Sequence, residues 1–416
     1  MNSEDTTVGG EATGRMETLN IGIIGAGLMG REMASAAARS FVLEDFPIRI
    51  KVVAVSDIDP HRLNWFGKVP GVKSLFRDYR DLLALPEVHA VYAAVPHYLH
   101  TEVYERCLLS GKDLLAEKPF GMDQAAARAL CQAAGRTGRF VRCSSEFPYY
   151  PGAQKAFQIV NSGALGTILE VKAGFLHSSD LNPHKPINWK RQSATCGMIG
   201  VMGDLGLHVT HLPLRLGWRP ATVYAQLQKV YTRRPDGRGG MAVCDTWDNA
   251  MLHTTVQAQG QTFPMTLEMK RVAPGETNTW YFQAIGTQGG VKYSTKEPKT
   301  LWTFSGNEDP EWTRRDLGSQ SCFPTITGSI FESGFSDSLL QMLAAFAWER
   351  SGRPDCPFPC ATPKEALESH TLFAAGLESH RLGAVVPVKP ADADDATPVL
   401  MNEGKPTPAA AIGTRA

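Results

Sequence analysis

The sequence predicts an α/β protein with two domains: a doubly wound parallel sheet, then an α+β domain with a large, open, mostly antiparallel sheet. Up to about residue 147, short apolar runs alternate with helix-forming segments, which is typical of a parallel sheet covered on both faces. Beyond that point, strand-like segments gather between residues 221 and 301, and two helices are expected to close the chain. Grouped strands with separate helices indicate an α+β domain.

A glycine-rich turn follows the first predicted strand. It reads Gly25-Ala26-Gly27-Leu28-Met29-Gly30. In this strand–turn–helix context, the spacing predicts a dinucleotide-binding turn of the Rossmann type. Gly25 would allow the sharp turn, Gly27 would let a pyrophosphate approach the backbone, and Gly30 would let the helix pack on the strand. The alternative is an ordinary strand-to-helix connection.

Other candidate ligand-binding residues fall at the carboxyl ends of predicted strands, where ligands bind in such sheets. Asp57 ends the strand 48–56 and would accept hydrogen bonds from the adenosine ribose while repelling a 2′-phosphate. We therefore predict NAD as cofactor, with NADP less favoured. Pro96 and His97 follow the strand 90–95, and Lys118 follows the strand 113–116.

Length and composition set the domain division. The chain of 416 residues is too long for one ordinary domain. We expect a disordered leader (1–18), a Rossmann domain (19–147), a substrate-binding and oligomerisation domain (148–388) and a disordered tail (389–416). Lys plus Arg and Asp plus Glu number 42 each, so net charge favours neither nucleic acid nor an anionic membrane as partner.

The sequence contains neither an apparent membrane or signal segment nor a zinc-type cysteine pattern. No apolar run approaches the roughly 20 residues that cross a bilayer, and the first 20 residues have no signal core, so we expect a cytoplasmic protein. Cys356 and Cys360 are the closest cysteine pair, but they lack the second pair of ligands that a structural zinc site needs. We predict no metal site.

Lys118 is the first candidate catalytic residue, because the preceding strand and Pro119 direct it toward the nicotinamide end of a bound dinucleotide. A positive charge about 4 Å from a developing alkoxide contributes roughly 4 kcal/mol at an effective dielectric near 20. Such a charge would ease deprotonation of an alcohol. The alternative is a solvated surface lysine.

Asp204, His208 and His211 form the second candidate group. Their spacing places all three on one face of a predicted helix. A carboxylate paired with an imidazole suits general acid–base chemistry near neutral pH. Spacing alone equally allows an acid favoured by the helix dipole together with a buried structural histidine.

Taken together, these motifs resemble those of the glucose–fructose oxidoreductase/inositol dehydrogenase/MocA (Gfo/Idh/MocA) family. Besides the glycine turn and Asp57, the similarity covers Val95-Pro96-His97-Tyr98-Leu99-His100, Glu117-Lys118-Pro119, Asn161-Ser162-Gly163-Ala164-Leu165-Gly166, Asp204-Leu205-Gly206-Leu207-His208 and Gly286-Thr287-Gln288-Gly289-Gly290. These segments match the family patterns T-P-N-x-x-H, E-K-P, s-G-x-x-G, D-x-G-x-H and G-T-x-G. The resemblance extends from about residue 19 to residue 387.

The resemblance implies an NAD(P)-dependent oxidoreductase that transfers a hydride between nicotinamide C4 and a secondary hydroxyl of a sugar, polyol or glycoside. It implies Lys118, Asp204 and His208 as catalytic residues, with His208 accepting the hydroxyl proton. It adds His100 and Glu117 to the cofactor site, and Trp189, Lys190 and Arg191 to the substrate side. It also implies a homodimer or homotetramer formed through the open sheet.

Some positions depart from the family pattern. His97 replaces the family's asparagine, and only Gly197 and Gly200 remain of the glycine run before the catalytic helix. These departures leave the substrate open. Two alternative functions also stay open: a glycosidase that uses bound NAD for transient oxidation and elimination, and a non-catalytic sugar-sensing regulator.

Overall fold

The computed structural model describes residues 16–306, 311–318, 321–328 and 332–391. Most of the predicted leader and tail lies outside these residues. The parts that are described are ordered: strand β1 (Glu17–Ile24) includes the last two residues assigned to the leader. At the other end, Ala391 is buried, and its carbonyl accepts a hydrogen bond from Arg128. Within the described chain, no helix is both long and apolar enough to span a membrane.

The N-terminal domain contains a six-stranded, all-parallel sheet, which confirms the predicted fold class. The strand order is β3-β2-β1-β4-β5-β6, with β1 at the point where the order reverses. Its further strands are β2 (Ile48–Ser56), β3 (Ser74–Phe76), β4 (Ala90–Ala93), β5 (Asp113–Ala116) and β6 (Val141–Cys143). The helices are α1 (Leu28–Ala38), α2 (Pro60–Phe66), α3 (Tyr79–Leu83), α4 (His100–Leu109) and α5 (Gln124–Thr137).

Helix α2 was not expected from the sequence. Asp59 caps it by accepting a hydrogen bond from the backbone N–H of His61, and Pro60 occupies the first helical position. An aspartate cap followed by proline is a recognised helix start, but the segment carries only two buried residues, Leu63 and Phe66. So short an apolar stripe gives little helical periodicity to detect.

The second domain contains a nine-stranded sheet, which confirms the mostly antiparallel arrangement. Its order is β16-β15-β14-β13-β7-β12-β11-β8-β17, and β7 with β12 is its one parallel pair in the described chain. The strands are β7 (Ile168–Leu176), β8 (Pro220–Gln228), β11 (Asn249–Ala258), β12 (Gln261–Lys270), β13 (Thr279–Gly286), β14 (Gly289–Ser294), β15 (Thr300–Ser305), β16 (Thr313–Asp316) and β17 (Val386–Pro387). A separate hairpin joins β9 (Arg233–Pro235) to β10 (Met241–Val243).

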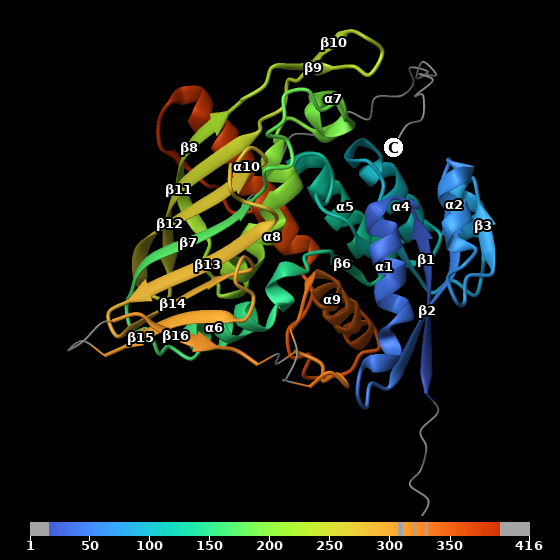
Figure 1. The fold of residues 1–416 in the computed structure, drawn as a ribbon, viewed down its shortest axis with the longest axis horizontal. Coiled ribbons are helices and arrows are strands. Elements are labelled where there is room, and N and C mark those ends of the chain that lie inside the picture. The colour runs from blue at the N-terminus through green and yellow to red at the C-terminus, as the bar shows by residue number, and fades with distance from the viewer. Residues whose placement is uncertain (1–15, 307–310, 319–320, 329–331, 392–416) are drawn as a thin grey trace, which may run out of the picture.

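One face of the large sheet is covered and the other is not covered by the described chain. Helices α6 (Pro151–Asn161), α8 (Val201–Arg215) and α10 (Pro363–Leu382) share one apolar core with the strands, on the side of the sheet turned toward the N-terminal domain (Figure 1). The alternating burial along β11 shows that every second side chain faces away from that core.

The C-terminal helices connect the two domains. Helix α9 (Phe335–Arg350) contributes Leu339, Leu343 and Phe346 to the core that contains β1, β2 and α1. Helix α10 packs between β8 of the large sheet and α5 of the N-terminal domain. A division of the chain by residue range therefore does not describe these two helices, which pack on both domains.

Candidate functional site

The glycine turn is closely packed at Gly25 and Gly30 and open at Gly27. Gly25 adopts a φ of +102°, and a Cβ there would lie 2.2 Å from the carbonyl oxygen of Ala94. A Cβ at Gly30 would lie 2.0 Å from the carbonyl oxygen of Gly25, so helix and turn touch directly. A Cβ at Gly27 would instead point into open space, with its nearest neighbour 4.0 Å away. Helix α1 begins there without a side-chain cap, which leaves its N–H groups available to an anion.

Asp57 lies at the end of β2, beside this turn. Its Oδ2 accepts a hydrogen bond from the Ala26 backbone N–H at 2.7 Å, and its Oδ1 accepts one from the Asp59 backbone N–H at 2.9 Å. The carboxylate therefore holds the glycine turn in place. Leu28 and Met29 lie between Gly27 and Gly30 of the turn; the Leu28 side chain is exposed and that of Met29 is half-buried.

Lys118 and Asp204 meet between the two domains. Lys118 follows β5, and its Nζ donates to the Asp204 main-chain oxygen at 2.7 Å and to Asp204 Oδ1 at 3.1 Å. Burial alone would lower the pKa of Lys118, but Asp204, together with the charges of Glu117 and Glu146, more than offsets this and raises it, so the ammonium stays charged. The structure thus brings together two of the predicted catalytic residues, 86 positions apart in the chain.

The Asp204 carboxylate also forms ion pairs with two further side chains, those of Lys190 and Arg271. Lys190 Nζ lies 2.9 Å from Oδ1 and 3.2 Å from Oδ2, while Arg271 donates to Oδ2 from Nε at 3.1 Å and from Nη2 at 3.0 Å. Burial would raise the pKa of Asp204, but Lys118, Lys190 and Arg271 hold it well below the usual value. Arg271 was not predicted from the sequence. It could have been found as a basic residue that directly follows a buried strand, β12.

His208 lies one helical turn after Asp204 on α8, between the rings of Phe147 and Phe175. The ring centroids are 5.2 and 5.4 Å from that of His208, both in edge contacts. Burial lowers the pKa of His208 well below its usual value, so the imidazole is neutral at physiological pH. Its Nδ1 is buried and has no hydrogen-bond partner among the described residues.

Glu146 is a second site residue that the sequence reading missed. It lies just beyond β6, is buried, and places Oε2 3.9 Å from His208 Nδ1. Burial, together with the charge of Glu117, raises the pKa of Glu146 to about 8. Its position in the sequence could have indicated a site residue, because Glu146 follows a strand of the same parallel sheet as the strand that precedes Lys118.

The remaining predicted cofactor residues are anchored around the strand ends. His100 is fully buried, with ring nitrogens 2.7 Å from the Pro119 carbonyl oxygen and 2.9 Å from that of Val95. Glu117 accepts hydrogen bonds from Tyr92 Oη and from the Lys118 backbone N–H. Both side chains therefore brace the segments that carry the predicted nicotinamide-side residues.

His97 and the segment Trp189–Arg191 face each other across the domain boundary. The His97 ring meets Trp189 edge-on with centroids 4.6 Å apart, and His97 Nδ1 lies 3.2 Å from the Cys196 carbonyl oxygen. Arg191 differs from its neighbours. Its guanidinium is buried and pairs with Asp180 at 2.8 Å and Asp248 at 3.1 Å, which leaves it almost no accessible surface for a substrate.

Gly197 and Gly200 are the two glycines that remain of the run before α8, and their geometry explains why both are glycine. Both have positive φ values, +88° and +54°. A Cβ at Gly197 would lie 2.6 Å from the Met122 carbonyl oxygen, and one at Gly200 would lie 2.8 Å from the Trp247 backbone nitrogen. These two positions therefore need glycine, and they set the start of the helix that carries Asp204 and His208.

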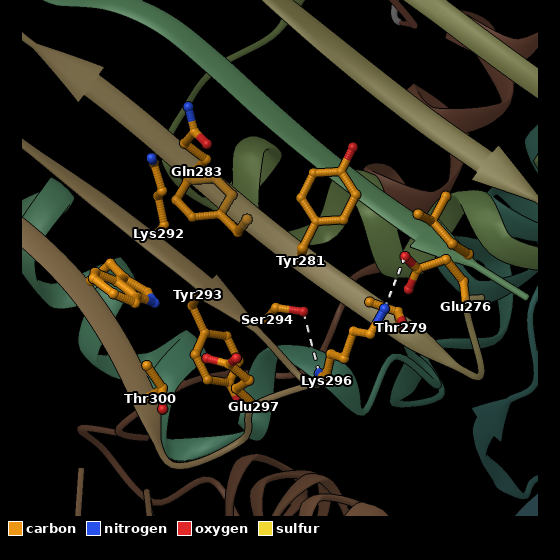
Figure 2. Close-up of a pocket in the computed structure, with 13 residues that line it drawn as sticks. Glu276, Thr279, Tyr281, Gln283, Lys292, Tyr293, Ser294, Lys296, Glu297 and Thr300 are labelled. Carbon is orange, nitrogen blue, oxygen red and sulfur yellow. Dashed lines mark hydrogen bonds and ion pairs between the residues drawn. The ribbon is translucent and has the colours of Figure 1, made fainter. Parts of the chain in front are cut away.

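A hollow on the large sheet lies apart from these residues. It has a volume of about 340 Å³ and is lined from β13, β14 and the turn after β14, including Tyr281, Lys292 and Glu297 (Figure 2). None of the predicted catalytic, cofactor or substrate residues lines it. We therefore place the candidate site at Lys118, Asp204 and His208.

Two family models match this chain. Residues 19–145 match the oxidoreductase family with an NAD-binding Rossmann fold, and residues 153–292 match the GFO/IDH/MocA C-terminal domain. The chain belongs to the Gfo/Idh/MocA family of oxidoreductases. Membership confirms the resemblance read from the sequence motifs, and it confirms the N-terminal domain of this Gfo/Idh/MocA protein as an NAD-binding domain.

Curated relatives include dehydrogenases. The chain is 26% identical to levoglucosan dehydrogenase from Pseudarthrobacter phenanthrenivorans over 295 residues, which cover 67% of this chain and 74% of the relative. It is 25% identical to trans-1,2-dihydrobenzene-1,2-diol dehydrogenase from Bos taurus over 255 residues, covering 58% of this chain and 72% of the relative.

Solved structures share the fold of this chain. Levoglucosan dehydrogenase in complex with NADH and L-sorbose superposes with a TM-score of 0.80 and 21% identity, covering 90% of this chain and 100% of that one. An inositol dehydrogenase homologue from Azotobacter vinelandii, in complex with NAD+, gives a TM-score of 0.75 and 20% identity over 90% and 98% of the two chains. At these identities, the likeness supports the fold alone.

Proposed function

We propose that this protein is an NAD-dependent dehydrogenase acting on a secondary hydroxyl of a sugar, polyol or glycoside. The observation that carries the proposal is the contact of Lys118 with Asp204, with His208 one helical turn away. These groups supply a fixed positive charge, a carboxylate and a neutral imidazole beside the carboxyl ends of the NAD-binding sheet. Two curated relatives are named as dehydrogenases, one of levoglucosan and one of a dihydrodiol, which agrees with the proposal.

The cofactor would be held by the glycine turn and the neighbouring strand ends. Backbone N–H groups in Gly25–Gly30 would bind the pyrophosphate, and Asp57 would bind the adenosine ribose. Pro96, His97 and Glu117 would border the nicotinamide side, with His100 bracing them. Bound NAD supplies a hydride acceptor at nicotinamide C4.

Each catalytic side chain then has a separate task. Lys118 would donate to the substrate oxygen and stabilise the negative charge that develops on it. His208 would accept the hydroxyl proton, which its neutral state at physiological pH allows. As the C–H bond breaks, its electron pair leaves with the hydride and the carbon–oxygen double bond forms. Asp204 would orient both the ammonium and the substrate.

The substrate would lie between Trp189 and the catalytic residues. An aromatic face with a neighbouring ammonium, Lys190, suits a sugar ring with its hydroxyls. Subunits would associate through the uncovered face of the nine-stranded sheet to form a homodimer or homotetramer. We propose a cytoplasmic location for the enzyme.

The test is to mix the purified protein with NAD and a panel of sugars and polyols while following the absorbance of reduced nicotinamide. Substrate-dependent growth of that absorbance, lost in Lys118→Ala, supports a dehydrogenase. Glycoside cleavage without net absorbance change would instead favour a glycosidase that oxidises its substrate transiently. Sugar binding without turnover would favour a regulator.

A further inference from the structure

His177 is an imidazole beside the candidate site that the proposed mechanism does not use. It directly follows β7, and its backbone N–H donates to the Lys270 carbonyl oxygen at 2.7 Å, while its carbonyl oxygen accepts from the Ala273 N–H at 2.8 Å. These two hydrogen bonds hold His177 against the segment that carries Arg271, which itself donates twice to Asp204 Oδ2. The backbone therefore fixes the position of His177 relative to the Asp204 carboxylate.

The His177 side chain lies on the face of the sheet that α8 covers. Along β7, Phe175 is buried in the core shared with α8, and His177, two residues later, continues the same face. The Phe175 ring contacts both imidazoles, with its centroid 4.6 Å from that of His177 and 5.4 Å from that of His208. The largest effects of neighbouring charges on the pKa of His177 come from residues of the candidate site, namely Asp204, Lys190, Lys118 and Arg271.

The ring nitrogens of His177 are accessible. Neither of them has a hydrogen-bond partner among the described residues. Neither is fully buried, in contrast to the unpartnered Nδ1 atoms of His208 and His211, and the residue as a whole is half-buried. Burial lowers the pKa of His177 to about 4, so the imidazole is uncharged at neutral pH and offers one N–H donor and one acceptor.

We propose that His177 binds a second hydroxyl of the substrate and so determines which hydroxyl of the ring is oxidised. The inference rests on the proposed dehydrogenase function, in which Lys118 and His208 hold the reacting hydroxyl. A hydroxyl both donates and accepts hydrogen bonds, as a neutral imidazole does, so the two groups are complementary. A second contact also fixes the rotation of the sugar ring, which one contact leaves open. The substrate class is therefore a polyhydroxylated ring.

The experiment compares sugars with derivatives that lack one hydroxyl: D-glucose with its 2-deoxy, 3-deoxy and 4-deoxy forms, and D-galactose with its 2-deoxy form. Initial rates of NAD reduction give kcat and KM in the wild type and in His177→Phe, which keeps an aromatic ring and removes both nitrogens. In the wild type, we expect one deoxy derivative to have a kcat/KM about three- to tenfold below that of its parent, as for the loss of one neutral hydrogen bond. In His177→Phe that ratio should fall to about one. A derivative that neither protein oxidises lacks the reacting hydroxyl.

Further variants separate a role in binding from a role in folding. His177→Phe should raise KM for the parent sugar more than it lowers kcat, because the contact exists before and during the reaction. His177→Gln keeps a donor and an acceptor and should restore part of the wild-type ratio. His253→Phe makes the same substitution at an exposed position of β11, on the other face of the sheet, and should leave every ratio unchanged. Fluorescence of bound NADH reports cofactor binding in each variant.

Chemical modification tests accessibility without turnover. Diethyl pyrocarbonate acylates neutral imidazoles, and peptide mass spectrometry locates the modified residues. We expect His177 to react faster than the fully buried His208 and His211, and we expect D-glucose or D-galactose with NADH to slow only its reaction and not that of His253. A rate at His177 no faster than that at His211 would contradict the accessibility on which the inference depends.

The kinetic outcomes are distinct. If the deoxy derivatives match their parents in the wild type, or differ from them equally in His177→Phe, the inference is overturned and the proposed function stands. A fall in kcat by several orders of magnitude in His177→Phe, equal for parent and deoxy sugars, would make His177 the proton acceptor and overturn its role in binding. If NADH binds but no sugar is oxidised, the proposed function itself fails.

Discussion

Glu146 Oε2 lies 3.9 Å from His208 Nδ1, and both groups are buried at the centre of the candidate site. One is an acid that burial keeps protonated up to about pH 8, and the other is a base that burial keeps neutral. Their proximity links the protonation of the proposed general base to that of a second group. Ionised Glu146 would favour the imidazolium form of His208 and so make it a stronger base.

The first prediction concerns this pair and pH. For alcohol oxidation, kcat should rise between about pH 7 and pH 9 as Glu146, whose pKa is about 8, loses its proton. In Glu146→Gln that rise should disappear, while activity near pH 6 changes little, since the wild-type side chain is already neutral there. Full pH–rate profiles of both proteins provide the measurement. An unchanged rise in the variant would separate Glu146 from the proton transfer.

The same carboxyl predicts a pH-dependent stability. Its pKa is higher in the folded protein than the ordinary 4.5, so its contribution is present below pH 4.5 and is lost as pH rises toward 8. Each pKa unit corresponds to about 1.4 kcal/mol, so wild type should lose a few kcal/mol relative to Glu146→Gln between pH 5 and pH 9. Urea unfolding at several pH values measures the difference, and parallel curves for the two proteins would contradict it.

Removing the Lys118 ammonium should chiefly affect the chemical step. We expect Lys118→Ala to lower kcat by about a hundred- to a thousandfold, because a charge near the developing alkoxide contributes a few kcal/mol. Lys118→Arg keeps the charge in a different shape and should recover part of the rate. Stopped-flow measurement of hydride transfer tests both variants. A Lys118→Ala protein with wild-type kcat would remove the lysine from the mechanism.

Asp204 should be a stabilising residue as well as a catalytic one. Asp204→Asn leaves the buried Arg271 and the partly exposed Lys118 and Lys190 without their shared counter-ion, and breaking a buried ion pair on one side costs about 3–5 kcal/mol. Adding Lys190→Gln to that variant should restore part of the loss, since it removes one of the repelling charges. Chemical unfolding of the two single variants and the double variant measures the coupling. Strictly additive effects would show that the two side chains do not interact.

Asp57 should control both cofactor choice and the shape of the turn. Asp57→Ala loses the acceptors for the Ala26 and Asp59 N–H groups, so NAD affinity should fall about tenfold and discrimination against NADP should weaken. Asp57→Asn keeps one acceptor and should lose less affinity, while still losing the repulsion of a 2′-phosphate. Titration of both dinucleotides by fluorescence reports the ratio, and a preference unchanged in both variants would contradict the assignment.

The sequence predicted those parts of the site whose position follows from the alternation of strands and helices along the chain. The glycine turn, Asp57 and Lys118 each follow a strand of one parallel sheet, so their convergence follows from the topology. Arg271 was missed because it follows a strand of the second domain and reaches the site only when that domain packs onto the first. Glu146 was missed although it follows β6 of the parallel sheet, the same kind of position as that of Lys118. Arg191 illustrates the opposite case: a motif placed it with the substrate, and burial with Asp180 and Asp248 gives it a structural task.

The secondary structure shows a similar limit. Strand β2 was predicted with its observed ends, because its run of β-branched residues is bounded by a proline and an aspartate. Strand β14 starts with Gly289 and Gly290, which carry no β propensity, and it was not distinguished from the turn before it. Its formation depends on the antiparallel neighbours β13 and β15, which lie on either side of it.

The packing of α9 against β1 and α1 has a consequence for the way this chain is made. Leu339, Leu343 and Phe346 are buried in the N-terminal core, against residues that precede them by about 300 positions. A ribosome-bound chain that has emerged only as far as the large sheet would therefore present the nucleotide domain with an open apolar flank. That domain reaches its final packing only when about five-sixths of the polypeptide has been synthesised, so chaperone protection during translation would matter most for the first domain to appear.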